Sequence, residues 1–248
     1  MDLLSYISQA GKRKARFIER ARDLAAEHPS VEKLEAEMME RNNRLVDRLK
    51  YARIRFSEFE RVAADETITS ALAAIMIGDG ADSKLKDSTF ASTLGTLPYL
   101  IKFFGEIQKA MKMGRIDYAS EDYADSPTKY ASRSYRIDDD AIQDAIDMMP
   151  TRDIDKTEGS IPATWEGVQE RMSRYIVTPA YGWYQTGRAE KERRTGRTEM
   201  RRSCRCDKRS CQDCFFYASQ GWQPIGALPM PGKRCQCYDR CRCAIDYR

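Results

Sequence analysis

The cysteines constrain this chain more than any other feature, because all eight lie between Cys204 and Cys243. They form two groups of four: Cys204, Cys206, Cys211 and Cys214, then Cys235, Cys237, Cys241 and Cys243. The twenty residues between the groups are rich in Gly and Pro, which is typical of turns. A segment of about 45 residues is too short to build a hydrophobic core alone. We therefore expect disulfides or metal ions to stabilise it.

The spacing of the cysteines and their expected compartment favour metal. The N-terminus places its apolar residues before its charges, the reverse of a secretory signal, so we expect folding in a reducing cytosol. Clustered thiols bind metal there more often than they form disulfides. Cys211 and Cys214 have the spacing of a zinc knuckle. A C-x-C pair in a strand can also chelate, because alternate side chains share a face.

We accordingly predict that the eight cysteines bind one or two Zn²⁺ ions, with disulfides and free thiols as the alternatives. Which cysteines share an ion stays open, because pairing within a group and pairing across the groups fit equally well. Arg and Lys side chains around them would offset the charge of −2 on a four-thiolate zinc site.

The same basic residues allow a second interpretation. Residues 184–248 hold fifteen Lys and Arg against seven Asp and Glu, whereas the rest of the chain holds 27 basic and 31 acidic residues. Such a tail can contact phosphates through Arg201, Arg202, Lys208 and Arg209. It can also stack bases on Trp222, Phe215, Phe216 and Tyr217.

The cysteine-free part predicts a mainly α fold, with an elongated helical body over residues 1–194 and the basic cysteine-rich module over 195–248. A heptad-like stripe predicts one long helix over about residues 30–64, packed along another helix of its own chain or of a neighbour. The stripe comprises Leu34, Met38, Leu45, Leu49, Ala52, Phe56, Phe59 and Ala63. Asn42 fills its one polar position, either to set the register of packed helices or as an exposed side chain.

Capping and breaking residues predict the other helices. These are residues 2–27 ended by His28-Pro29, a helix capped by Ser30, a short apolar helix or strand over 67–77, 98–113 with Gly114 after it, 138–149, one opened by Thr164 and ended or kinked by Pro179, and 185–194. No apolar run approaches the length of about 20 residues that a bilayer span needs. Residues 115–136 carry Tyr118, Tyr123, Tyr130 and Tyr135 without a period, which fits an arm lying on a partner or a solvated loop.

The sequence offers little to catalysis. His28 is the single histidine, which excludes sites that need two imidazoles, and no phosphate-binding or nucleophile-elbow motif is present. Acidic runs at Asp138-Asp139-Asp140 and at Asp153 and Asp155 are better explained as helix caps than as a hydrolase site. We expect a protein that is not an enzyme.

The tail resembles a known family. Gly196-Arg197-Thr198-Glu199, the Cys211-x2-Cys214 pair, the Gly221-Trp222-x-Pro224 stretch, Pro229-x-Pro231-Gly232 and the closing Cys241-Arg242-Cys243 resemble the C-terminal segment of Mu F-like head-morphogenesis (minor head) proteins of tailed phages. The resemblance covers residues 196–248, about a fifth of the chain. Family members commonly have an RTE-type helix and a terminal His-Pro-Asn-Cys-Arg-Cys. This chain lacks that histidine and has Cys204, Cys206, Cys235 and Cys237 in addition, so a thiolate can take the place of the imidazole.

The resemblance implies a virion structural protein, a minor head protein or head-tail connection subunit in the head, portal or neck region. Its expected partners are other virion subunits, further copies of itself as a homo-oligomer, and packaged DNA, with no membrane. It would be synthesised in the host cytoplasm and reside in the virion. The alternative is a zinc-stapled nucleic-acid-binding protein.

Overall fold

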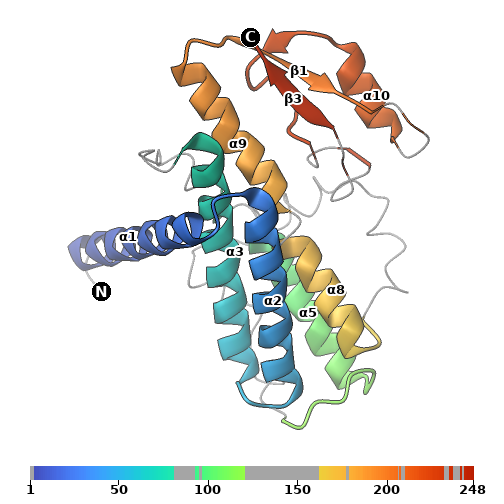
Figure 1. Cartoon of the computed structure of the whole chain (residues 1–248). Coiled ribbons are helices and arrows are strands. Elements are labelled where there is room, and N and C mark those ends of the chain that lie inside the picture. The colour runs from blue at the N-terminus through green and yellow to red at the C-terminus, as the bar shows by residue number, and fades with distance from the viewer. Residues whose placement is uncertain are drawn as a thin grey trace. The chain divides into compact units, whose positions relative to one another are not determined.

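The computed structural model describes residues 3–80, 93–94, 97–120, 162–176, 179–205, 207, 210–231, 235–236, 241 and 243–248. Over these residues the chain is mainly helical, with seven helices and three short strands, which confirms the predicted fold class (Figure 1). None of the helices described is long and apolar enough to cross a membrane. The chain divides into two compact units: Met1–Glu35 with Thr69–Lys84 and Thr178–Arg248, and Ala36–Ile68 with Leu85–Val177.

The second unit is built from four helical segments that run side by side in Figure 1. They belong to α2 (Val31–Lys50), α3 (Phe56–Asp79), α5 (Leu97–Lys112) and α8 (Trp165–Ile176). Apolar contacts join α3 to α5, where the rings of Phe59 and Phe104 lie 5.7 Å apart. An ion pair joins α5 to α8, with 2.6 Å between Glu106 and Arg171. The unit therefore has a closed apolar core with polar links at its edge.

The predicted helix over residues 30–64 is wrong in one respect: it is two helices, α2 and α3. Ala52 adopts a positive φ of 50° after the end of α2. Its N–H bonds the carbonyl of Leu49, and the N–H of Arg53 bonds the carbonyl of Arg48, each at 2.8 Å. This pattern is a Schellman motif, which ends a helix and usually has Gly at the residue of positive φ. Because Ala occupies that position here, the sequence gives no sign that the helix ends. Seven of the eight stripe residues are buried within this chain, Ala52 being the exposed exception.

Asn42 proves to be buried rather than exposed. Only 3% of its surface is accessible. Its Nδ2 donates to the Ser173 Oγ at 3.0 Å and to the Gln169 carbonyl at 3.3 Å, both on α8. An amide at this position bonds only in one alignment of α2 against α8, so Asn42 sets the register of these two helices.

Other predicted helix ends are confirmed. The helix α1 (Leu3–Glu27) ends before His28, a half-buried side chain 3.9 Å from the Glu27 carboxylate. Ser30 and Thr164 accept backbone hydrogen bonds at the starts of α2 and α8. Gly114 follows α5 in a Schellman motif. In addition, α9 (Pro179–Arg194) begins at its proline, earlier than the predicted residue 185.

Two glycines allow α3 and α9 to touch backbone to backbone in the first unit. A Cβ on Gly78 would lie 2.0 Å from the Tyr184 carbonyl oxygen, and a Cβ on Gly187 would lie 2.0 Å from that of Ile75. Near this contact the Arg194 guanidinium pairs with the buried Asp79 carboxylate, with 2.9 Å between Arg194 Nη1 and Asp79 Oδ2. The contact requires glycine on both helices.

The C-terminal module of the first unit contains a small antiparallel sheet of order β2-β1-β3. Its strands are β1 (Glu199–Ser203), β2 (Gln223–Pro224) and β3 (Ala244–Tyr247), and α10 (Gln212–Ser219) accompanies them. The predicted helix 138–149, the tyrosines at 123, 130 and 135, and the aspartates at 138–140, 153 and 155 lie outside the described residues. Tyr118 is described and donates to the Ile54 carbonyl at 3.3 Å.

The glycine contact predicts an asymmetric response to Gly→Ala substitution. We expect Gly187→Ala to lower the melting temperature by about 3–10 °C, because overpacking costs about 1–3 kcal/mol. Gly167→Ala in α8 is the matched control, since its Cβ would meet no atom closer than 3.6 Å. Circular dichroism melts of both variants test this, and equal melting temperatures would show that the α3–α9 contact does not depend on glycine.

Candidate metal centre

The strand β1 divides its side chains between two environments. Met200 and Arg202 are buried, whereas Arg201 between them is exposed. Alternation along a strand places Met200 and Arg202 on the same face. Met200 packs there with Leu228 and Ile245 in a small apolar core. Arg202 therefore occupies a core position next to the cysteines.

The start of α10 positions the first two sulfur atoms. Cys211 is the N-cap residue in extended conformation, and its carbonyl accepts the N–H of Cys214 at 3.0 Å and that of Phe215 at 3.3 Å. This turn brings the two Sγ atoms to 3.5 Å of each other. Cys214 is buried and Cys211 is half-buried.

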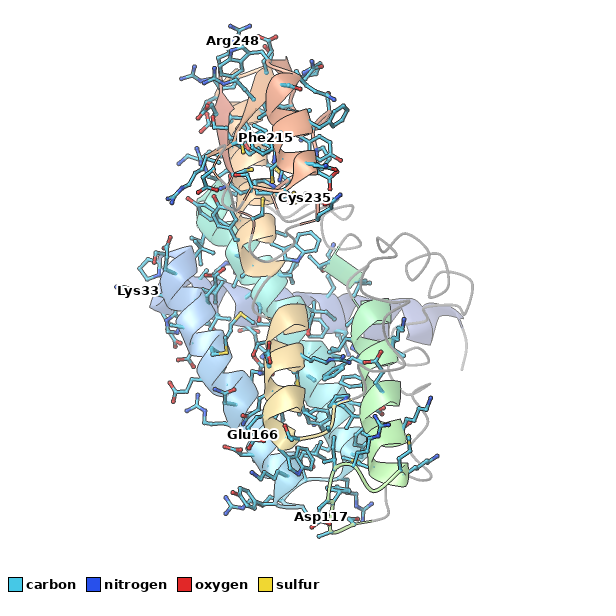
Figure 2. All side chains as sticks on the ribbon, turned by 90° about the vertical axis from the view of Figure 1, so that its right-hand side faces the viewer. Lys33, Asp117, Glu166, Phe215, Cys235 and Arg248 are labelled. Carbon is cyan, nitrogen blue, oxygen red and sulfur yellow. The ribbon has the colours of Figure 1, made fainter. Side chains whose placement is uncertain are left out.

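The second group of cysteines reaches the same place from two directions. Cys235 is held beside α10 because the N–H of Gln236 donates to the Asp213 carboxylate at 2.9 Å. Cys241 and Cys243 directly precede β3, which pairs with β1 through Arg202 opposite Ile245 and Ser203 opposite Ala244. Figure 2 shows the sulfur atoms near the labelled Cys235, in the same module as Phe215 and Arg248.

The sulfur atoms form two overlapping sets with metal-ligand geometry. Cys211, Cys214 and Cys235 form one set, and Cys214, Cys241 and Cys243 form the other, with the sulfurs of each set within 4.8 Å of one another. Four sulfurs at about 2.3 Å around a tetrahedral ion lie about 3.8 Å apart. The separations of 3.5 Å for Cys211–Cys214 and 3.8 Å for Cys214–Cys241 agree with that edge. These cysteines can therefore hold a metal ion.

The sets bear on the question of pairing for the cysteines described. Each set combines Cys214 of the first group with cysteines of the second group, so the groups converge rather than forming separate sites. Cys235 joins Cys211 and Cys214 in one of the sets. Cys204 packs against the cluster without belonging to either set. Cys206 and Cys237 lie outside the described residues.

Disulfides are not the arrangement found among the cysteines described. None of Cys204, Cys211, Cys214, Cys235, Cys241 and Cys243 is in a disulfide. The Cys211–Cys214 separation of 3.5 Å is far longer than a sulfur–sulfur bond of about 2.0 Å.

Arg202 is the residue of the candidate site that the sequence does not single out. It was grouped with Arg201 as a surface charge, yet only 1% of its surface is accessible. Its Nη2 lies 3.0 Å from the Cys241 Sγ, 3.3 Å from the Cys235 Sγ and 3.9 Å from the Cys214 Sγ. Its Nη1 donates to the Pro229 carbonyl at 3.3 Å, and its guanidinium lies over the Tyr217 ring. The available signal was the alternation with Met200 in Glu199–Ser203.

Hydrogen bonding polarises the sulfur cluster. The pKa of Cys241 is lowered because its thiolate accepts hydrogen bonds, first from Cys235 and then from Cys243. The pKa values of Cys235 and Cys243 are raised, because each donates toward Cys241 and each is buried. Burial opposes the charge of Arg202, but its hydrogen bond to Cys235 and the charge of Cys241 raise its pKa. Negative charge on sulfur and the guanidinium thus stabilise each other.

The outward face of the sheet carries a different cluster. The guanidinium carbons of Arg201 and Arg248 lie 4.9 Å and 4.5 Å from the centre of the Trp222 ring. Phe215 and Phe216 on α10 are exposed. Tyr217 is half-buried and packs instead against both the apolar core and the cysteines, so part of its ring is not accessible for stacking on a base.

Comparisons with protein-family models, with curated proteins and with solved structures give no match. The structure differs from the family pattern at one described point. Arg197 and Thr198 follow the end of α9, and Glu199 begins β1, so these residues do not form the RTE-type helix. A Schellman motif at Gly196, with its φ of 87°, ends the helix before them.

The shared position of Cys214 predicts which single substitution weakens metal binding most. We expect Cys214→Ser to weaken metal binding more than any other single Cys→Ser substitution, because Cys214 is the one cysteine that belongs to both described sets. Cys204→Ser is the matched control and should leave an ion bound. Elemental analysis and the absorption of the Co²⁺-loaded protein measure both, and an unchanged metal content in Cys214→Ser would contradict the assignment.

Proposed function

We propose that this protein is a structural, non-catalytic component of a tailed-phage virion whose C-terminal module is held together by zinc. The observation that carries the proposal is the convergence of Cys211 and Cys214 with Cys235, Cys241 and Cys243. The C-x-x-C pair and the closing C-x-C pair are the residues on which the resemblance to Mu F-like minor head proteins rests. A metal ion bound by these cysteines would cross-link α10 to the segment that leads into β3.

The ligand set supports zinc as the ion. Thiolates are soft ligands that select Zn²⁺, Cu⁺ and iron–sulfur clusters, and four sulfurs in a tetrahedron are typical of structural zinc. Each set supplies three sulfurs, and a fourth thiolate from the other set would close the site. A closed site of this kind leaves no position for water or substrate, whereas catalytic zinc sites keep one open. The centre would therefore stabilise the fold rather than perform chemistry.

The proposed station is the head, portal or neck region of the particle, with other virion subunits and further copies of this chain as partners. The stripe on α2 and α3 does not supply the contact surface, because seven of its residues are buried in the chain itself. The exposed Phe215 and Phe216 beside the metal centre are better candidates for a subunit contact.

A zinc-stapled nucleic-acid-binding protein is the second candidate, favoured by the Arg201–Trp222–Arg248 cluster. Trp222 is half-buried, and arginine beside an aromatic ring is a common arrangement for binding a single strand. Against it, Arg201 pairs with Asp246 at 2.9 Å and Arg248 with Glu199 at 2.7 Å, which offsets both positive charges.

The zinc centre predicts the composition of the purified full-length protein. We expect one or two zinc ions per chain by elemental analysis. Chelation should unfold residues 204–248 and leave most of the helical circular dichroism, because no cysteine lies upstream. Less than about half an equivalent of metal, together with disulfide-bonded cysteines, would contradict the zinc centre.

The two candidate functions predict opposite answers to which of two variants is more damaging. Cys211→Ser with Cys214→Ser removes the two thiolates at the start of α10, and we expect it to abolish incorporation into particles. Arg201→Gln with Arg248→Gln keeps every cysteine, and we expect normal incorporation. A nucleic-acid function reverses this order, because the charge variant would then lose affinity and salt dependence. Particle incorporation and salt titrations of DNA binding distinguish the two.

A further inference from the structure

We infer that Arg202 is the internal counter-ion of the metal centre, donating N–H···S hydrogen bonds to metal-bound thiolates and thereby strengthening four-thiolate coordination of a soft divalent ion. This inference rests on the zinc centre proposed above. It assigns to Arg202 a positioning and charge-balancing role that is separate from that of the ligands themselves.

The contacts of Arg202 make the inference independent of which cysteines bind the ion. Its Nη2 reaches Cys235 of one set, Cys241 of the other set and, at 3.9 Å, the shared Cys214. Two sulfurs of either set therefore lie next to the same nitrogen. Whichever of the two sets binds the ion, the guanidinium therefore lies beside a coordinated sulfur.

The Pro229 carbonyl and the Tyr217 ring carry no net charge, so the burial of Arg202 is best explained by negative charge on these sulfurs. A fully buried guanidinium is costly unless an opposite charge pairs with it. No carboxylate among the described residues accepts a hydrogen bond from Arg202. The oxygen that accepts one is the uncharged carbonyl oxygen of Pro229. The Nε of Arg202 is also buried and has no hydrogen-bond partner among the residues that the structure describes. Neutral thiols are weak acceptors, so the compensating charge must come from thiolates, which metal coordination supplies.

The positive charge of Arg202 also offsets the negative charge expected of the metal site. A divalent ion with four thiolates carries a net charge of −2, which is unfavourable in an apolar interior. One guanidinium at hydrogen-bond distance halves that charge and fixes the orientation of the sulfur lone pairs. Partners of this kind beyond the ligands typically change metal affinity by 10–100-fold when they are removed.

The neighbouring strand residue provides a matched control. Arg201 is on the same strand and carries the same charge, but its side chain is 45% exposed and pairs with Asp246. If zinc affinity depends only on the overall charge of the module, Arg201→Met and Arg202→Met should lower it equally. An effect that requires hydrogen bonds to sulfur appears in Arg202→Met alone.

The test compares the full-length wild type with Arg202→Met, Arg202→Lys and Arg201→Met. Zinc affinity is measured by competition with a chromophoric chelator. We expect about 10–100-fold weaker binding in Arg202→Met, a smaller loss in Arg202→Lys, which keeps the charge, and wild-type affinity in Arg201→Met. Equal affinities for Arg202→Met and wild type would overturn the inference.

Absorption of the Co²⁺-loaded proteins separates this role from simple structural support. Loss of hydrogen bonds raises the energy of the sulfur electrons, so the sulfur-to-cobalt charge-transfer band of Arg202→Met should move to longer wavelength. If that variant does not fold, Arg202→Lys provides the same readout, and a band identical to that of wild type would overturn the inference. Failure of the wild type to bind zinc or cobalt would overturn the zinc centre itself, whereas binding that is insensitive to Arg202 would overturn the counter-ion role alone.

Discussion

The burial of one positive charge among sulfur atoms is the constraint on which the C-terminal module depends. Arg202 stands at a core position of β1 and contacts sulfurs from α10, from Cys235 and from the segment before β3. A guanidinium cannot be left in an apolar interior without a partner, so these segments must converge on it or the strand cannot bury its face. The three apolar residues Met200, Leu228 and Ile245 are too few to hold the module by themselves.

The helical part of the chain is stabilised in a different way. Its core is apolar, with Phe59 against Phe104, and polar groups are buried where they set alignment, as Asn42 does against Ser173. Close approach of α3 and α9 needs Gly78 and Gly187 because backbone meets backbone there. Apolar burial thus stabilises the helices, whereas the module depends on contacts among its cysteines and Arg202, and the metal centre proposed there would make its stability depend on metal.

Local signals predicted much of this architecture because they act over a few residues. Ser30, Thr164 and Gly114 are at the helix ends where capping chemistry places them. The break at Ala52 was missed because a positive φ at a non-glycine residue is selected by the packing of α2 against α3 rather than by its own side chain. Likewise, Glu199 begins a strand, although the family pattern suggested a helix, because it pairs with the last residues of the chain.

For the candidate metal centre, the ligand chemistry follows from the amino-acid sequence, because the cysteines are confined to residues 204–243, have chelating spacings and lie in a segment too short for an apolar core. The sequence left open which cysteines meet, because residues far apart in sequence are brought together only by the pairing of β1 with β3 and by the position of α10. Tertiary structure decided that both cysteine groups share one cluster around Cys214. It also decided that Arg202 is inside and Arg201 outside, because the face of β1 that packs against the cluster determines which of two identical side chains meets sulfur and which meets water.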